Sequence, residues 1–280
     1  MEKILKRYFP IFVLPTLIVF IIAFIIPFVM GCGLSFTSFR TVIDAQWVGF
    51  DNYVRAFSDG NFLNALGFTA GFAIVTVITI NVLAFGLALI LTRKLKGTNI
   101  FRTIFFMPNL IGGIVLGYIW KLIINGFLQK WAVTLTYSPS FGFWGLVILM
   151  NWQMIGYMMI IYIAGIQSIP DTLIEAAKID GASSGRILRS FTIPLVMPSI
   201  TICTFLTVSN SFKLFDQNLA LTAGDPANKT AMLALDIYNT FYSRVGWEGV
   251  GQAKAVIFFI LVAIIALLQL RLTRSKEVTN

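Results

Sequence analysis

The chain has 280 residues, of which 58% are hydrophobic and 12% are charged, and its mean hydropathy is +0.85. Because an average soluble domain is about 25% charged, this composition excludes a soluble globular enzyme and a disordered chain, and it predicts an all-α polytopic membrane protein. The formal charge of +9 comes from basic residues in short runs between apolar segments, so we interpret it as a signature of membrane topology and not of nucleic-acid binding.

Histidine and several motifs that carry chemistry are missing. The chain has no histidine, which removes Ser-His-Asp triads and histidine-ligated metals, and its two cysteines, Cys32 and Cys203, are too far apart to suggest a metal motif. No P-loop sequence occurs, so we expect no ATP site. The sequence therefore predicts no catalytic residue, no metal site and no cofactor bound by this chain.

Six segments are long and apolar enough to cross a membrane as helices of about 20 residues. The first is too long for a secretory signal peptide and no small-residue cleavage site follows it, so we expect it to remain in the protein. The third contains Pro108 and several glycines, and the fifth is the most polar. We expect one transmembrane domain over residues 1–280, with spans at about 11–30, 66–91, 104–124, 143–166, 195–215 and 253–270.

The basic residues predict the orientation of these spans. Six spans place both termini on one side, and 13 of the 21 Lys and Arg residues fall on that side. Because cytoplasmic loops carry the excess of Lys and Arg, both termini are expected in the cytoplasm. The 13 residues are Lys3, Lys6, Arg7, Arg93, Lys94, Lys96, Arg102, Lys178, Arg186, Arg189, Arg271, Arg274 and Lys276.

The cytoplasmic segment between the fourth and fifth spans, residues 169–194, reads as two short amphipathic helices with a turn between them. Such a segment is either a solvated connector or a surface that enters a cleft of a partner. We expect Pro170 to be the first helical residue, Gly181 to be a left-handed stop, Ser183 or Ser184 to cap the second helix, and Pro194 to end it.

Polar side chains gather in the fourth and fifth spans. Polar groups inside a membrane bundle either contact a solute or hydrogen-bond neighbouring helices, and the sequence leaves both open. Thr207, Ser211 and Leu214 share one helical face, with Asn210 beside them, and Gln153 and Tyr157 are four residues apart.

Three stretches resemble a known family. Glu175-Ala176-Ala177, then Gly181, then Pro194 thirteen residues later, resembles the EAA loop of binding-protein-dependent ABC importer permeases, with Phe191 and Ile193 in place of the usual Ile and Leu. The segments 47–53 and 212–226 are similar to the V-G-L-x-N-Y and F-x-x-F-D…L-T-x-G-G-P signatures of the sugar permeases of the maltose and glycerol-phosphate type, although Asp225 stands where glycine is usual.

The resemblance implies the type I ABC importer permease fold in a bacterial or archaeal cytoplasmic membrane. It implies a heterodimer with a second permease, two ATP-binding subunits that hold ATP and Mg, and an extracytoplasmic binding protein that delivers a sugar, most naturally an oligosaccharide. By matching positions, ATPase coupling would fall to Glu175, Ala176, Ala177, Asp180 and Gly181, and substrate contact to Gln153, Tyr157, Thr207, Asn210, Ser211 and Leu214.

Two other classes of protein, an ion-coupled secondary transporter and an intramembrane enzyme, fit the sequence less well. An ion-coupled secondary transporter of a small polar solute would be expected to carry acidic residues deep in its spans and an internal repeat, and neither is evident in the sequence. An intramembrane enzyme would need a paired nucleophile and base or a metal cluster, which the missing histidine and scattered cysteines disfavour.

Overall fold

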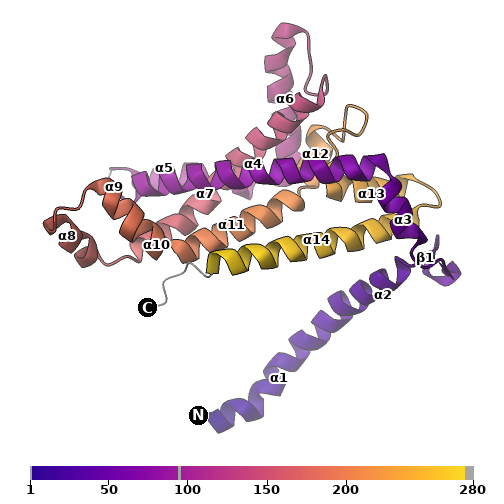
Figure 1. Cartoon of the computed structure of the whole chain (residues 1–280), viewed down its shortest axis with the longest axis horizontal. Helices are drawn as coiled ribbons and strands as arrows, with labels where there is room; N and C mark the ends of the chain where they lie inside the picture. The colour runs from indigo at the N-terminus through magenta and orange to yellow at the C-terminus, as the bar shows by residue number, and fades with distance from the viewer. Residues whose placement is uncertain (1, 94–95, 275–280) are drawn as a thin grey trace. The chain divides into compact units, whose positions relative to one another are not determined.

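Figure 1 shows a computed structural model of the chain, which describes residues 2–93 and 96–274. Lys94 and Lys276 of the predicted cytoplasmic set lie outside the described residues. The chain divides into two compact units, and each is described by itself. The first comprises Met1–Phe62 with Ile237–Phe259, and the second comprises Leu63–Asp236 with Ile260–Asn280.

The first unit begins with one long helical segment and continues into a small hairpin and a short helix. In the hairpin, Thr37 lies opposite Trp47 and Ser38 opposite Gln46 in antiparallel register. The elements are α1 (Glu2–Phe20), a π turn (Ile21–Ile25), α2 (Ile26–Leu34), β1 (Thr37–Ser38), a 3-10 turn (Val42–Asp44), β2 (Gln46–Trp47) and α3 (Asp51–Ser58), joined by the ends of α13 (Leu233–Ser243) and α14 (Glu248–Arg274) that fall in this unit.

The second unit is built on α4 (Gly60–Leu91), α7 (Pro139–Gln167) and α11 (Met197–Phe212). Its other helices are α5 (Thr98–Phe106), α6 (Gly113–Leu128), α8 (Asp171–Ile179), α9 (Ser184–Ile187), α10 (Ile193–Leu195) and α12 (Asp216–Leu221). Short turns of other helical types link them at Met107–Leu110, Gln129–Trp131 and Leu188–Thr192.

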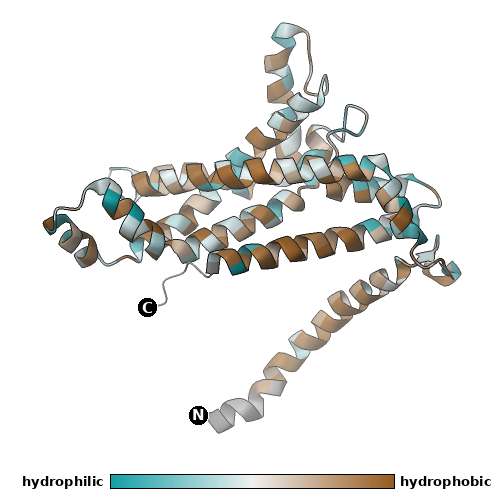
Figure 2. Cartoon of the chain, in the orientation of Figure 1, coloured by the Kyte–Doolittle hydropathy of each residue, from teal (hydrophilic) through white to brown (hydrophobic). Residues whose placement is uncertain are grey.

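Four helices in the described residues are long and apolar enough to cross a membrane: Ile11–Leu34, Gly60–Leu91, Pro139–Gln167 and Glu248–Thr273. Two further crossings are available if each of two bent helix pairs makes one, which gives the predicted total of six. Figure 2 shows hydrophobic residues along most of α1, α4 and α14, as a lipid environment requires. The predicted fold class is therefore confirmed, and the span boundaries differ by several residues.

The predicted third span, 104–124, is not one straight helix. The pair Thr98–Leu110 and Gly113–Trp131 is bent by 102°, and α6 points away from α5 in Figure 1. The cause is local, because Pro108 lies in a 3-10 turn and Gly112 adopts an extended conformation, with φ −60° and ψ 141°, just before α6 begins. Proline removes a backbone donor and glycine tolerates such a break.

The predicted fifth span, 195–215, is also shorter and bent. Its straight part is α11, which ends at Phe212, and the preceding helical stretch Ser184–Leu195 meets it at 68°. Pro194 does not end the second short helix as predicted, because it lies inside α10. A π turn directly before Pro194 allows the helical stretch to continue through the proline. In this turn Ile193 donates its N–H to the carbonyl of Leu188. Widening the helix before a proline relieves the clash of its ring with the preceding turn.

The core of the second unit lies around α7. Its central side chains, among them Leu146, Met150, Met158 and Tyr162, are almost fully buried against α4 and α11. Gly156 lets α5 approach α7 so closely that a Cβ at this position would overlap the carbonyl oxygen of Phe105. The helix with the polar candidates Gln153 and Tyr157 is therefore held rigidly from several sides.

Candidate functional site

The segment with the E-A-A sequence forms the predicted pair of short helices. Helix α8 starts at Asp171 with Pro170 as its N-cap, one residue later than predicted, and Gly181 has the expected left-handed φ of +79°. Ala182 donates its N–H to the Ala177 carbonyl at 2.9 Å, and Gly181 donates to the Lys178 carbonyl at 3.0 Å. These two hydrogen bonds form a Schellman motif, which closes the helix end firmly.

The next helix is capped as predicted. The Ser183 hydroxyl accepts a 3.4 Å hydrogen bond from the Arg186 N–H, which satisfies one of the free donors at the start of α9. Between the two helices the chain therefore has a defined turn and not an open loop. The predicted coupling set divides by exposure: Glu175, Ala176, Asp180 and Gly181 are exposed, and Ala177 is buried.

An apolar surface accompanies the exposed coupling residues on α8. The Ile179 side chain is 86% exposed and that of Leu173 is 39% exposed. Covering large exposed aliphatic side chains with a partner removes apolar surface from water, which is favourable. The geometry of α8 thus suits a protruding element that docks into a groove, with small alanines and a glycine allowing close approach.

The predicted substrate residues on α11 do not all face the same way. Thr207 and Ser211 are buried on one face of α11, whereas Asn210 is exposed. Leu214 is also buried, but it lies beyond the end of α11 at Phe212 and so does not share that helical face as predicted. Two of the buried hydroxyls meet α4. Thr207 accepts a 3.4 Å hydrogen bond from Asn81, and Ser211 lies 2.9 Å from the Thr76 hydroxyl. In this structure Thr207 and Ser211 therefore join helices, and Asn210 is available to a solute or a partner.

On α7, Gln153 sits at the break between α5 and α6. Its Nε2 donates to the carbonyl of Ile111 at 3.5 Å, and its Oε1 accepts a 2.9 Å hydrogen bond from Gln217 of α12. Tyr157 is half-buried, with its ring centroid 6.4 Å from that of Phe106. Gln217 was not singled out from the sequence, because no spacing links residue 217 to a residue 64 positions earlier.

The segment 47–53, which resembles the V-G-L-x-N-Y signature, has a clear structural role. Gly49 has a φ of +62° and makes the turn into α3. The amide of Asn52, which is 2% exposed, donates to the Ser35 carbonyl at 3.0 Å and to the Thr37 carbonyl at 2.8 Å. The Tyr53 hydroxyl lies 2.6 Å from that of Ser35. This signature therefore fastens α3 to the end of α2.

The second signature, ending in Leu221–Pro226, is organised around Asn218. This fully buried side chain donates to Thr222 Oγ1 and to the Thr230 carbonyl, and it accepts from the Met232 N–H, each at 2.9 Å. Asp225 stands where glycine is usual, and the turn accommodates it because the positive φ angles fall on Ala223, at +53°, and Gly224, at +90°, and not on Asp225.

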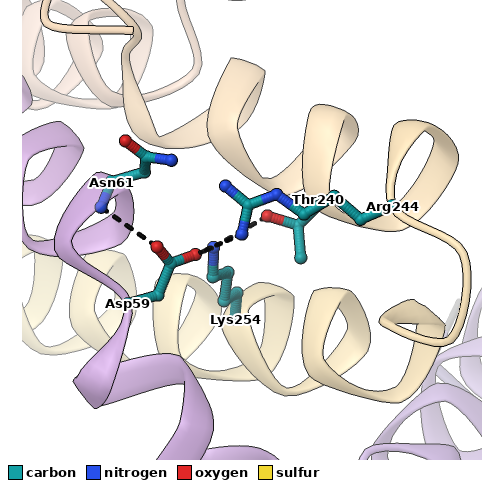
Figure 3. A network of polar contacts seen from close by, with 5 residues as sticks. All are labelled: Asp59, Asn61, Thr240, Arg244 and Lys254. Carbon is teal, nitrogen blue, oxygen red and sulfur yellow. Dashed lines mark hydrogen bonds and ion pairs between the residues drawn. The ribbon is translucent and has the colours of Figure 1, made fainter.

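The first unit also contains a buried ionic network that no pattern in the sequence predicted. Figure 3 shows Asp59, Asn61, Thr240, Arg244 and Lys254. Asp59 Oδ2 accepts from Lys254 Nζ and from Arg244 Nη1, each at 2.8 Å, and Oδ1 accepts from the Asn61 N–H at 3.1 Å. Lys254 is fully buried and also donates to Thr240 Oγ1 at 2.7 Å.

No three His, Cys, Asp or Glu side chains gather as a metal site within the part of the chain that the structure describes. The two free cysteines are Cys32, half-buried, and Cys203, buried. Within the same residues, the polar groups on α7 and α11 are amides and hydroxyls, a chemistry suited to uncharged hydroxyl-rich solutes or to hydrogen bonds between helices.

Comparison with known proteins identifies this architecture. Residues 81–278 match the family described as binding-protein-dependent transport system inner membrane component. The probable starch degradation products transport system permease protein of Thermoanaerobacterium thermosulfurigenes is 46% identical over 96% of this chain and 94% of its own length. The multiple sugar-binding transport system permease protein of Streptococcus mutans is 31% identical over 99% of both chains.

The fold matches chains in solved structures of ABC transporters. A chain of a bacterial ABC transporter involved in the import of the acidic polysaccharide alginate superposes with a TM-score of 0.82, at 21% sequence identity, over 98% of both chains. A chain of the alginate transporter in complex with its pentasaccharide-bound periplasmic protein superposes with a TM-score of 0.83. At this level of identity, the likeness concerns the fold.

Proposed function

This chain belongs to the family of binding-protein-dependent transport system inner membrane components, and from that premise we propose that it is one permease subunit of an ATP-driven sugar importer. Membership makes it a multi-pass membrane transport subunit and not an enzyme. The observation that carries the sugar assignment is full-length similarity to two permeases whose names specify starch degradation products and multiple sugars. The solute we propose is an oligosaccharide.

The proposed site of ATPase docking is helix α8 with its Schellman turn. Glu175, Ala176, Asp180 and Gly181 are exposed there, and Ile179 is the most exposed aliphatic side chain of the segment. Since this chain has no P-loop of its own, ATP and Mg would be bound by two partner subunits. The partner would cover the aliphatic surface of α8, with the small residues allowing its backbone to approach closely.

The proposed mechanism follows from how α8 connects to the membrane helices. Helix α9, the π turn and α10 form one helical stretch, Ser184–Leu195, that meets α11 at 68°. A movement imposed on α8 by closure of the ATPase is therefore passed directly to α11, which carries Thr207, Asn210 and Ser211. Rigid-body rocking of packed helices converts such small shifts into a change between two conformations of the permease.

The proposed solute path is lined by the polar groups that remain accessible. Asn210 is exposed and Tyr157 is half-buried, so they would touch the sugar or the second permease directly. Gln153, Thr207, Ser211 and Leu214 are more buried and would shape the site from behind, with Gln153 held by Gln217. An external sugar-binding protein would deliver the solute, and both termini would lie in the cytoplasm.

Uptake by the intact host tests this proposal. A strain without the gene should lose uptake of a labelled maltooligosaccharide, and the wild-type gene should restore it. Glu175→Lys should fail to restore uptake although the chain reaches the membrane in normal amounts, because it reverses the charge at the docking helix. Unchanged maltooligosaccharide uptake in the deletion strain would contradict the proposed solute, and restored uptake by Glu175→Lys would contradict the docking role.

A further inference from the structure

Helix α3 has its apolar face turned outward. Phe50, Val54 and Phe57 are spaced by four and three residues, which places them in one stripe along the helix. Their side chains are 70%, 63% and 55% exposed. The opposite face carries Asn52 and Ala56, which are 2% and 0% exposed. A water-soluble helix has the reverse arrangement, with its apolar stripe packed inside.

Two polar residues of α3 make contacts within the first unit. Asn52 binds the Ser35 and Thr37 carbonyls, as described above. The Arg55 guanidinium carbon lies 4.6 Å from the ring centroid of Trp247, so its charge is stacked on an aromatic face of the same unit. These inner contacts fix the rotation of α3 about its axis, so the apolar stripe is held facing outward.

The depth of α3 is set by the two membrane spans that flank it. Ser35, to which Asn52 donates, directly follows Leu34, the last residue of the first span. The second span starts at Gly60, two residues after α3 ends at Ser58. Both connections place α3 at the level where the apolar interior of the bilayer meets the headgroups.

From this geometry we propose that α3 lies at the membrane–water interface on the extracytoplasmic side of the cytoplasmic membrane. The stripe formed by Phe50, Val54 and Phe57 would face lipid acyl chains. Helices with one strongly apolar face bind in the plane of this interface, and aromatic residues concentrate there. The two spans that flank α3 in the chain are themselves strongly apolar, with mean hydropathies of 2.9 and 2.6. The neighbouring Trp47, 73% exposed, stands beside the helix on β2 as a further interfacial side chain.

Site-specific fluorescence in the assembled importer tests this assignment. The complex is purified with a Cys32→Ser, Val54→Cys chain, labelled with bimane and placed in phosphatidylcholine nanodiscs. Asp51→Cys in the same background is the matched control, because Asp51 is exposed on the same helix and is a charged residue outside the apolar stripe. Doxyl-labelled lipid reports contact with acyl chains, and iodide reports contact with water.

The account predicts that doxyl lipid quenches the probe at residue 54 more than the probe at residue 51, and that iodide quenches the probe at residue 54 less. Equal iodide quenching at both sites with no doxyl quenching would overturn the proposal. Protection from both quenchers, or protection that appears only when the sugar-binding protein is added, would assign the stripe to a protein partner and would also overturn it. Phe57→Cys, on the same stripe, gives an independent reading if the residue 54 variant does not assemble.

Discussion

Lys254, in the second turn of α14, donates a 2.8 Å hydrogen bond to Asp59, the residue that directly precedes α4. Lys254 is fully buried, and the Asp59 side chain is 8% exposed. Removing one member of a buried ion pair leaves the other charge without compensation, which costs about 3–5 kcal/mol. The Asp59–Lys254 contact therefore ties α14 to the start of α4.

We expect Asp59→Asn to lower the thermal stability of the purified complex strongly, because the buried Lys254 and the neighbouring Arg244 then lose the carboxylate that both contact. The double variant Asp59→Asn with Lys254→Met should recover much of the loss, since both charges are removed together. Thermal unfolding in detergent measures both. A single variant as stable as the wild type would show that the pair does not hold these helices.

The stabilising effect of Asp59 should depend on pH. Burial opposes ionisation of this carboxyl, but the hydrogen bonds from Lys254 and from the Asn61 N–H, with the charges of Lys254 and Arg244, hold its pKa below its ordinary value. A folded-state pKa below the unfolded one stabilises the fold above the unfolded value and loses that effect as pH falls through the folded value. The stability gap between wild type and Asp59→Asn should thus be constant near neutral pH and narrow below about pH 3.9.

Gly156→Ala should disrupt the packing of α5 on α7, because the added Cβ would overlap the Phe105 carbonyl oxygen. Forcing extra volume into a packed interior costs about 1–3 kcal/mol, so the midpoint of thermal unfolding should fall. Gly86→Ala is the matched control, since its Cβ would meet nothing within 4 Å. Equal effects of the two substitutions would contradict this close approach.

Gly181→Ala should weaken coupling to the ATPase. The left-handed conformation at Gly181, with φ of +79°, costs an alanine about 1–2 kcal/mol, so the Schellman turn at the end of α8 would open part of the time. Binding-protein-stimulated ATP hydrolysis in proteoliposomes should decrease. Gly185→Ala, in helix α9 with open space around it, should leave hydrolysis unchanged. Full stimulation in the Gly181 variant would argue against a rigid α8.

Thr207→Val and Asn210→Ala should affect different properties: the first should lower stability, and the second should raise the KM for uptake. Thr207 is fully buried and hydrogen-bonded to the Cys203 carbonyl and to Asn81, so its loss should reduce stability by about 1 kcal/mol and alter the apparent affinity for sugar little. Asn210 is exposed, so Asn210→Ala should raise the KM for uptake with little effect on unfolding. The opposite pattern would exchange the roles assigned to these two residues.

The number of spans and the turn chemistry of the coupling segment could be predicted from the sequence, because both depend on local order. Apolar length determines a span, and a glycine with a left-handed φ determines the turn at Gly181. The bend at Gly112 was harder to predict, since glycine and proline are tolerated in straight membrane helices as well as in broken ones.

Contacts between distant residues could not be predicted in this way. Asn81 meets Thr207 across 126 positions, and Asp59 meets Lys254 across 195. Hydrophobic periodicity gives the face of a helix but not the helix it touches. For the same reason, spacing and the family resemblance could place Asn210 beside Thr207 and Ser211 but could not show that the packing of α11 buries the latter two and leaves Asn210 exposed.

The central claim is that this chain works as one permease within an importer driven by partner ATPases. The most direct measurement is purification of the tagged chain from its own host in mild detergent, with identification of the bound proteins by mass spectrometry. The account predicts recovery of a P-loop ATPase and of a second, different permease of this family. A chain that purifies stably and alone, with neither partner, would contradict it.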